Sequence, residues 1–243
     1  MAKRFTQQTL KDAKLQVRRR ESFQCKLTRG GAVSTKIAYI VPSALQNQDN
    51  GVLEKEEVWT FLESFWGEEK VSKWKQLLLD GSEMNAYQIV NLMNLDLIVE
   101  RYWAFGLIAL RPISVNLEQT EMKVAFHWLP FREQLWDWDI KRKDKVSMLQ
   151  NPLQDPQYRP VSSPGRQHFV VVRREDDTFA SISSGYTFTL STDNNDQRPL
   201  PSFDLLELRW HLSRIAAFQG TDDDERSYSP AYDCQYNPES DSE

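Results

Sequence analysis

The sequence is poor in the residues that build metal centres and redox sites. It has two cysteines and three histidines in 243 residues. Cys25 and Cys234 form no closely spaced pair, which excludes the zinc patterns, and we interpret them as free thiols in a reducing compartment. His127, His168 and His211 lie in three different predicted elements, so nothing in the sequence brings two of them together. We therefore expect no metal site and no cofactor.

Long apolar runs are also missing. No stretch reaches the length of a membrane span, and the first residues lack the apolar core of a secretion signal. We therefore expect no membrane contact and an intracellular protein, cytoplasmic or nuclear. The short basic clusters at residues 3–4 and 18–20 could direct it to the nucleus.

The chain lacks the net positive charge that is typical of nucleic-acid-binding proteins. Its formal net charge is -5. The charge is uneven, however, because basic residues far outnumber acidic ones in residues 1–30, whereas acids dominate residues 221–243. The basic segment could contact phosphates, but the acidic remainder predicts that any nucleic-acid binding is weak.

Apolar and aromatic residues are plentiful. Hydrophobic residues make up 40% of the chain and aromatic residues 12%, including eight tryptophans. A chain of this length and composition can bury a substantial core. We expect a basic helix over residues 1–20, one folded domain over 21–220 and a disordered acidic tail over 221–243.

The first forty residues read as a helix followed by two strands. Residues 5–20 can form a basic amphipathic helix. Residues 21–42 indicate a strand, a turn at Gly30-Gly31 and a second strand that ends at Pro42, because glycine allows the positive φ values of a tight hairpin.

An aromatic helix pair and a strand–helix unit follow. Apolar residues recur at helical spacing over residues 58–79, and Gly67 marks a break between two helices. Burial in the core is the simpler interpretation of these aromatic residues, and an aromatic-lined pocket is the alternative. Residues 91–103 predict a short strand and then a helix with Asp96 as its N-cap.

The rest of the folded region is expected to contain hairpins and one helix. A hairpin over 107–129 has Met122, Val124, Phe126 and Trp128 on one face and Lys123, Ala125 and His127 on the other. Residues 130–167 are an extended, proline-rich excursion. Strands return over 168–192, with a hairpin turn at 173–178, and Ser202 caps a final helix over 203–218.

A series of short motifs in a fixed order resembles fungal proteins that contain an HNH nuclease domain. The resemblance covers roughly residues 18 to 220. The matching motifs are Arg20-Glu21, Cys25, Thr28, Ile37–Pro42, Phe65-Trp66, Trp74, Asn91–Asp96, Glu100–Trp103, Phe126–Pro130, Gly185–Thr192, Arg198–Ser202 and Leu205–Trp210. The fold class implied is α+β, with a degenerate HNH (ββα-metal-like) core, an inserted aromatic helix pair, extra β-hairpins and a C-terminal helix.

The resemblance implies a site whose chemistry has changed. An HNH nuclease needs a histidine base, an asparagine that orients it and ligands for one divalent metal. The corresponding catalytic positions hold Tyr39, Asn91 and Glu100, of which only Asn91 keeps the family residue. Near them, we expect Asp96, Arg101 and Trp103 to contact a substrate.

Three functions follow from these substitutions. The first is a binding or interaction module that has lost nuclease chemistry and whose partner is a small molecule or a protein. The second is a metal-free enzyme of fungal secondary metabolism, of the cyclase or isomerase type, acting on an apolar small molecule. The third is a weak nuclease in which Glu100 holds Mg²⁺.

Overall fold

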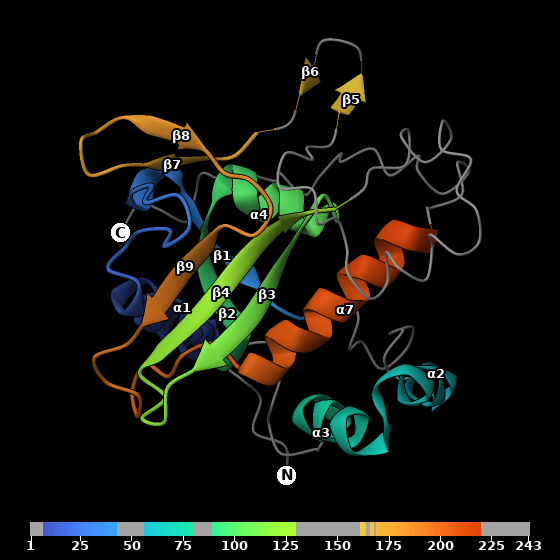
Figure 1. The fold of residues 1–243 in the computed structure, drawn as a ribbon. Helices are drawn as coiled ribbons and strands as arrows, with labels where there is room; N and C mark the ends of the chain where they lie inside the picture. The colour runs from blue at the N-terminus through green and yellow to red at the C-terminus, as the bar shows by residue number, and fades with distance from the viewer. Residues whose placement is uncertain are drawn as a thin grey trace.

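The computed structural model describes residues 7–42, 56–79, 89–129, 161–163, 166–167 and 169–219, and within these the fold is α+β, as expected (Figure 1). Its helices are α1 (Gln7–Arg20), α2 (Glu56–Trp66), α3 (Glu68–Leu79), α4 (Leu97–Ala104) and α7 (Phe203–Gln219). Its strands are β1 (Thr35–Tyr39), β2 (Leu92–Asp96), β3 (Ile108–Val115), β4 (Glu121–Trp128), β5 (Val161–Ser163), β6 (Arg166–Gln167), β7 (Val171–Arg173), β8 (Phe179–Ser181) and β9 (Thr187–Ser191).

The first two strands pair with each other across a long insertion. β1 and β2 are antiparallel, with Thr35 opposite Asp96 and Tyr39 opposite Leu92. α4 begins directly after β2 and packs against both strands. The predicted strand and helix over 91–103 are confirmed, including the cap, because Asp96 accepts a hydrogen bond from the Ile98 backbone N–H at 3.0 Å.

The predicted hairpin over residues 21–42 is wrong. Residues 21–31 form turns: the Cys25 N–H donates to the Gly30 carbonyl at 2.9 Å, and the Arg29 N–H donates to the Cys25 carbonyl at 2.7 Å. Ser22, Phe23 and Arg29 have positive φ values, which an extended strand does not allow. The real partner of β1 is β2, which is distant in sequence.

The largest sheet has the order β3-β4-β9 and is covered on both sides. Met122, Val124, Phe126 and Trp128 are buried in the main core, as the alternation predicted. On the other face, α7 packs along β3 (Figure 1). Trp210 of α7 belongs there to a buried cluster with Ala109 and Leu129. The second face is therefore partly buried rather than simply exposed.

The aromatic helix pair packs into the core beside α7. Gly67 separates α2 from α3 and has a φ of 81°, which confirms the predicted break. Trp59 and Trp74 are fully buried and belong to the core, whereas Phe61 and Phe65 expose 48% and 58% of their surface, so the core interpretation is confirmed for only part of the set. The Lys70 and Lys73 ammonium groups pair with carboxylates of α7, Glu207 at 2.7 Å and Asp204 at 2.9 Å.

The C-terminal part follows the sequence pattern where the structure describes it. β7 and β8 form the predicted hairpin, and the Ser202 hydroxyl accepts from the Leu205 N–H at the start of α7. Most of the predicted excursion over 130–167, and the whole predicted tail over 221–243, lie outside the described residues. None of the helices described is long and apolar enough to cross a membrane.

Candidate functional site

Asn91 lies just before β2, and its side-chain amide is hydrogen-bonded to the backbone of the segment after β1. Its side-chain oxygen accepts from the Val41 N–H at 2.9 Å, and its amide nitrogen donates to the Val41 carbonyl at 3.0 Å. The residue is only 2% exposed. Asn91 therefore holds two chain segments together, and its amide is used for structure.

Tyr39 and Glu100, the other two predicted catalytic residues, are not brought together. Tyr39 packs with Ile37 against the buried cluster under α1. Glu100 pairs with Lys36, with its Oε1 atom 3.1 Å from the lysine Nζ. Alternate residues of a strand point to opposite faces, so Lys36 and Tyr39 project from opposite faces of β1. Tyr39 and the Lys36–Glu100 pair therefore lie on opposite faces of β1 and do not form one site.

Arg101 and Trp103, predicted to bind substrate with Asp96, point elsewhere. The Arg101 guanidinium lies 5.8 Å from the Phe105 ring. Trp103 is buried in the core, and its carbonyl accepts a hydrogen bond from Arg209 at 3.3 Å. Neither residue lines the cavity to which Asp96 belongs.

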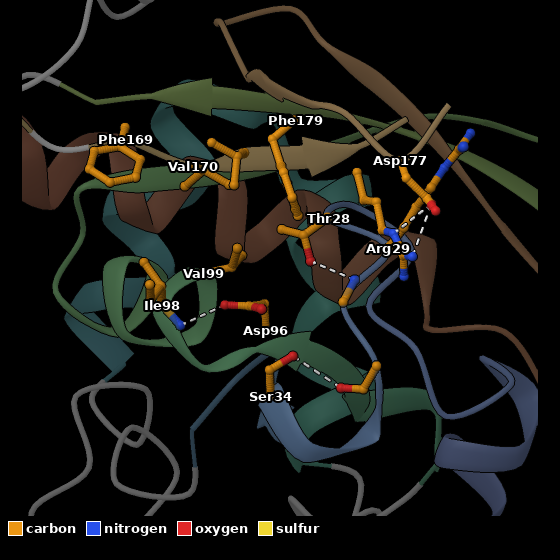
Figure 2. A pocket seen from close by; sticks show the side chains of 14 residues that line it. Thr28, Arg29, Ser34, Asp96, Ile98, Val99, Phe169, Val170, Asp177 and Phe179 are labelled. Carbon is orange, nitrogen blue, oxygen red and sulfur yellow. Dashed lines mark hydrogen bonds and ion pairs between the residues drawn. The ribbon is translucent and has the colours of Figure 1, made fainter. Parts of the chain in front are cut away.

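Asp96 lies on the wall of a cavity of about 400 Å³ (Figure 2). The walls come from the turn after α1, the start of α4 and the β7–β8 hairpin. The lining residues are Thr28, Arg29, Gly30, Gly31, Ser34, Asp96, Ile98, Val99, Phe169, Val170, Val171, Arg173, Asp177 and Phe179. The cavity is therefore assembled from three segments that are far apart in the sequence.

Three side-chain oxygens converge beside Gly30 at one end of this cavity. A Cβ atom on Gly30 would lie 2.9 Å from Ser34 Oγ, 3.0 Å from Asp96 Oδ2 and 3.2 Å from Thr28 Oγ1. The space beside Gly30 is therefore tight, and a side chain there would have to displace at least the Ser34 hydroxyl. We call Thr28, Ser34 and Asp96 the oxygen corner.

Apolar side chains form much of the remaining wall and of the rim of the cavity. Val99 and Val170 are buried in the wall. The rim carries large side chains that remain exposed to solvent: Ile98 at 52%, Phe169 at 57% and Phe179 at 68%. In Figure 2, the two phenylalanines lie on one side of the opening and the oxygen corner on the other.

The cations at the cavity have acidic neighbours in the β7–β8 turn. An Arg173 guanidinium nitrogen lies 2.9 Å from Asp177 Oδ1. Arg29 makes a longer pair with Glu175, at 3.9 Å. Neither arginine pairs with Asp96, so within the described residues the second oxygen of this carboxylate has no cationic partner.

Cys25 lies behind the oxygen corner and is suited to structure rather than to nucleophilic chemistry. Burial raises the pKa of its thiol above the ordinary value, and the hydrogen bond with Thr28 offsets this only in part. A thiol that stays protonated is a poor nucleophile and a poor metal ligand.

The histidines do not supply a metal site. His127 packs 5.0 Å from the Trp210 ring and His211 packs 4.4 Å from the Trp66 ring. Desolvation lowers the pKa of His127 to about 4 and that of His211 to about 3, so both are neutral at pH 7. His168 lies outside the described residues, and these contain no cluster of three His, Cys, Asp or Glu residues.

Sequence reasoning identified Asp96 but missed most of the cavity. Thr28 entered only as a motif residue, and Ser34, Phe169 and Phe179 were not singled out. Alternation could have shown that Phe169, Val171 and Arg173 share one face of a strand. Nothing in the local pattern indicated that this face meets the start of α4.

Comparisons of the chain with protein-family models, curated proteins and solved structures gave no match. The function must therefore be argued from the residues and their geometry.

Proposed function

We propose that the chain is an HNH-type scaffold without hydrolytic chemistry, and that it acts as a binding module whose ligand is a small molecule held in the cavity beside Asp96. The order β1, β2, α4 supports the scaffold part of this proposal, because two antiparallel strands followed by a helix are what the resemblance implies.

The contacts that the implied catalytic residues already make within the protein support the loss of nuclease chemistry. Lys36 neutralises the Glu100 carboxylate at the position where the resemblance implies a metal ligand. Both groups of the Asn91 amide are bound to Val41. A cation at this point opposes the approach of a second cation such as Mg²⁺.

The cavity supports the binding part of the proposal. Its volume of about 400 Å³ falls in the range of ligand sites, which is roughly 300–1,000 Å³. It combines apolar walls with a few polar atoms at one end, and that combination binds and orients small organic molecules.

Thermal melting of the metal-stripped protein tests the loss of metal-dependent chemistry. Mg²⁺, Mn²⁺, Ni²⁺ and Zn²⁺ are each expected to leave the melting temperature of the wild type and of Glu100→Gln unchanged. A ligand at 100 times its dissociation constant adds about 2.7 kcal/mol to stability, which such a melt detects easily. A rise that Glu100→Gln abolishes, together with cleavage of DNA or RNA, would establish the weak nuclease instead.

A metal-free enzyme using the same cavity is the second candidate. The observation that favours it is the Asp96 carboxylate oxygen facing a largely apolar cavity, since a carboxylate in such a place can move a proton on a bound molecule. Mass spectrometry of a bound compound after incubation separates the two functions. A module releases the compound unchanged, whereas an enzyme releases a product.

A further inference from the structure

We propose that the exposed side of α1 is an interaction surface, and that it binds the acidic segment over residues 233–243 of this same chain. The inference is independent of the proposed function, because it concerns a surface that does not belong to the cavity.

The inner side of α1 is apolar and holds the helix in place. Ala13 and Val17 are buried in a cluster with Ile37 and Leu92, where the helix packs against β1 and β2 (Figure 1). This packing fixes which side of the helix faces away from the fold.

The outer side of α1 is cationic. Residues three, four or seven positions apart share one side of a helix, so Lys11, Leu15 and Arg18 lie together, with Lys14 and Arg19 beside them. Lys11, Arg18 and Arg19 are exposed, and Leu15 is 38% exposed. We call Lys11, Lys14, Arg18 and Arg19 the cationic face.

The charges of the cationic face are not neutralised by the part of the chain that the structure describes. None of the four residues forms an ion pair there. The helix itself has a single acid, Asp12. Like charges three or four positions apart, such as Lys14 and Arg18, destabilise a helix, so an anion bound across them is stabilising.

Residues 233–243 carry the complementary charge. They contain four acids and no lysine or arginine: Asp233, Glu239, Asp241 and Glu243. An exposed ion pair is weak by itself. Attachment to the same chain compensates for this, because it gives the segment an effective concentration on the order of millimolar at the cationic face.

The length of chain after α7 is sufficient for this contact. Residues 233–243 follow Gln219, the last residue of α7, by 14 to 24 positions. At about 3.3 Å per extended residue they reach roughly 45–80 Å from the helix. A domain of this length is roughly 45 Å across. The acids at 222–225 reach only about 20 Å from α7, so the later acids are the better match.

A nucleic acid fits the cationic face less well than the acidic segment does. The net charge of the chain is -5, which repels a phosphate backbone at long range. A free polyanion also competes with a segment that is always present at the surface. The acidic segment therefore shields the cationic face from other anions.

Paramagnetic relaxation enhancement in the whole chain tests the contact. A thiol-reactive spin label attaches to Cys234, which lies in the acidic segment, because Cys25 is fully buried. We expect the amide signals of α1 to lose most of their intensity at about 10 mM salt. They should regain it at about 1 M salt, because the Debye length falls from about 30 Å to about 3 Å.

Two matched sets of substitutions locate the contact. The first set replaces three exposed cations of α1 by glutamine, a good helix former, and should abolish the loss of α1 signals: Lys11→Gln, Arg18→Gln and Arg19→Gln. The control set also removes one lysine and two arginines from exposed positions, and it should leave the loss unchanged: Arg111→Gln, Lys123→Gln and Arg174→Gln.

Several results would overturn the inference without affecting the cavity. Unchanged α1 signals at low salt would show that the segment does not bind there. The same conclusion follows if the loss survives the α1 substitutions or disappears in the control set. Loss of α1 signals in isotope-enriched, unlabelled protein mixed with spin-labelled protein would make a second copy the occupant. If the label has no effect but single-stranded DNA shifts the α1 amides, the surface binds nucleic acid instead.

Discussion

The two ends of β2 carry polar side chains that the protein uses in opposite ways. Asn91 precedes the strand and is buried, with its amide oxygen and nitrogen both bonded to Val41. Asp96 ends the strand and uses one carboxylate oxygen to cap α4, while the other faces a cavity. The two residues are five positions apart: the amide of Asn91 holds the fold, whereas Asp96 keeps one carboxylate oxygen that takes no part in the cap.

The comparison shows how to distinguish a structural polar residue from one that can bind a ligand. Buried polar groups are nearly always hydrogen-bonded, so burial and polarity alone say little. The informative property is unused hydrogen-bonding capacity that faces a cavity. By this criterion Asn91 is structural, and Asp96 is the residue to test.

Arg20 provides the strongest way to test the structural side of the comparison. Its guanidinium is fully buried and forms an ion pair with Glu21, with Nη2 2.7 Å from Glu21 Oε1. The guanidinium also donates hydrogen bonds to the carbonyls of Leu92 at 2.7 Å and Pro199 at 2.6 Å. Arg20→Leu leaves Glu21 buried without its partner and should cost about 3–5 kcal/mol in urea unfolding.

Arg19→Leu is the matched control, because Arg19 is exposed on the same helix and its loss should change stability little. Equal effects of the two substitutions would contradict the role assigned to the buried pair.

Acid should destabilise the protein through His211. Its pKa is about 3 in the folded protein against an ordinary value of 6.5, so the unfolded chain binds the proton first as the pH falls. The contribution of the neutral ring is present above pH 6.5 and is lost progressively down to about pH 3, with a loss on the order of 3 kcal/mol by pH 4.

Urea unfolding of the wild type and of His211→Phe at several pH values between 7 and 4 checks this prediction. The variant should lose less stability than the wild type over that interval. Parallel pH curves for the two proteins would show that His211 is not the group that titrates.

Alanine substitutions at the two ends of β2 test the comparison directly. Asn91→Ala removes both hydrogen bonds to the buried Val41 backbone and should cost about 2–3 kcal/mol. Asp96→Ala removes an N-cap and should cost about 1 kcal/mol. Thermal and urea unfolding measure both values, and a larger cost at Asp96 would reverse the assignment.

Glu100→Gln should have the smallest effect. The Lys36 and Glu100 side chains are 57% and 20% exposed, and an ion pair near the surface contributes less than about 1 kcal/mol. Urea unfolding of the wild type and of Glu100→Gln at low and high salt measures the contribution of this ion pair to stability. A loss above about 2 kcal/mol would mean that Glu100 supports more of the core than this pair alone.

The sequence predicted the elements that depend on local patterns. The break at Gly67, the cap at Asp96 and the hairpin of β3 and β4 each follow from residues within a few positions of one another. The hairpin predicted around Gly30-Gly31 failed because alternation and a glycine pair do not specify the partner of β1.

The candidate site was less predictable because it is made by distant segments. Asp96 could be chosen from its position between a strand and a helix. Ser34, Phe169 and Phe179 reach the same cavity only through the pairing of β1 with β2 and the packing of the β7–β8 hairpin over α4. Such contacts leave no local pattern in the sequence.

The bond from Arg20 to the Pro199 carbonyl has a consequence for the synthesis of the protein. Its two ends are 179 residues apart. At a translation rate of roughly 5–20 residues per second, the guanidinium waits on the order of 10–35 s before its last acceptor leaves the ribosome. During that time α1 can pack against β1 and β2 and pair Arg20 with Glu21, but a nascent chain that stops before residue 199 lacks this last hydrogen bond of the buried guanidinium.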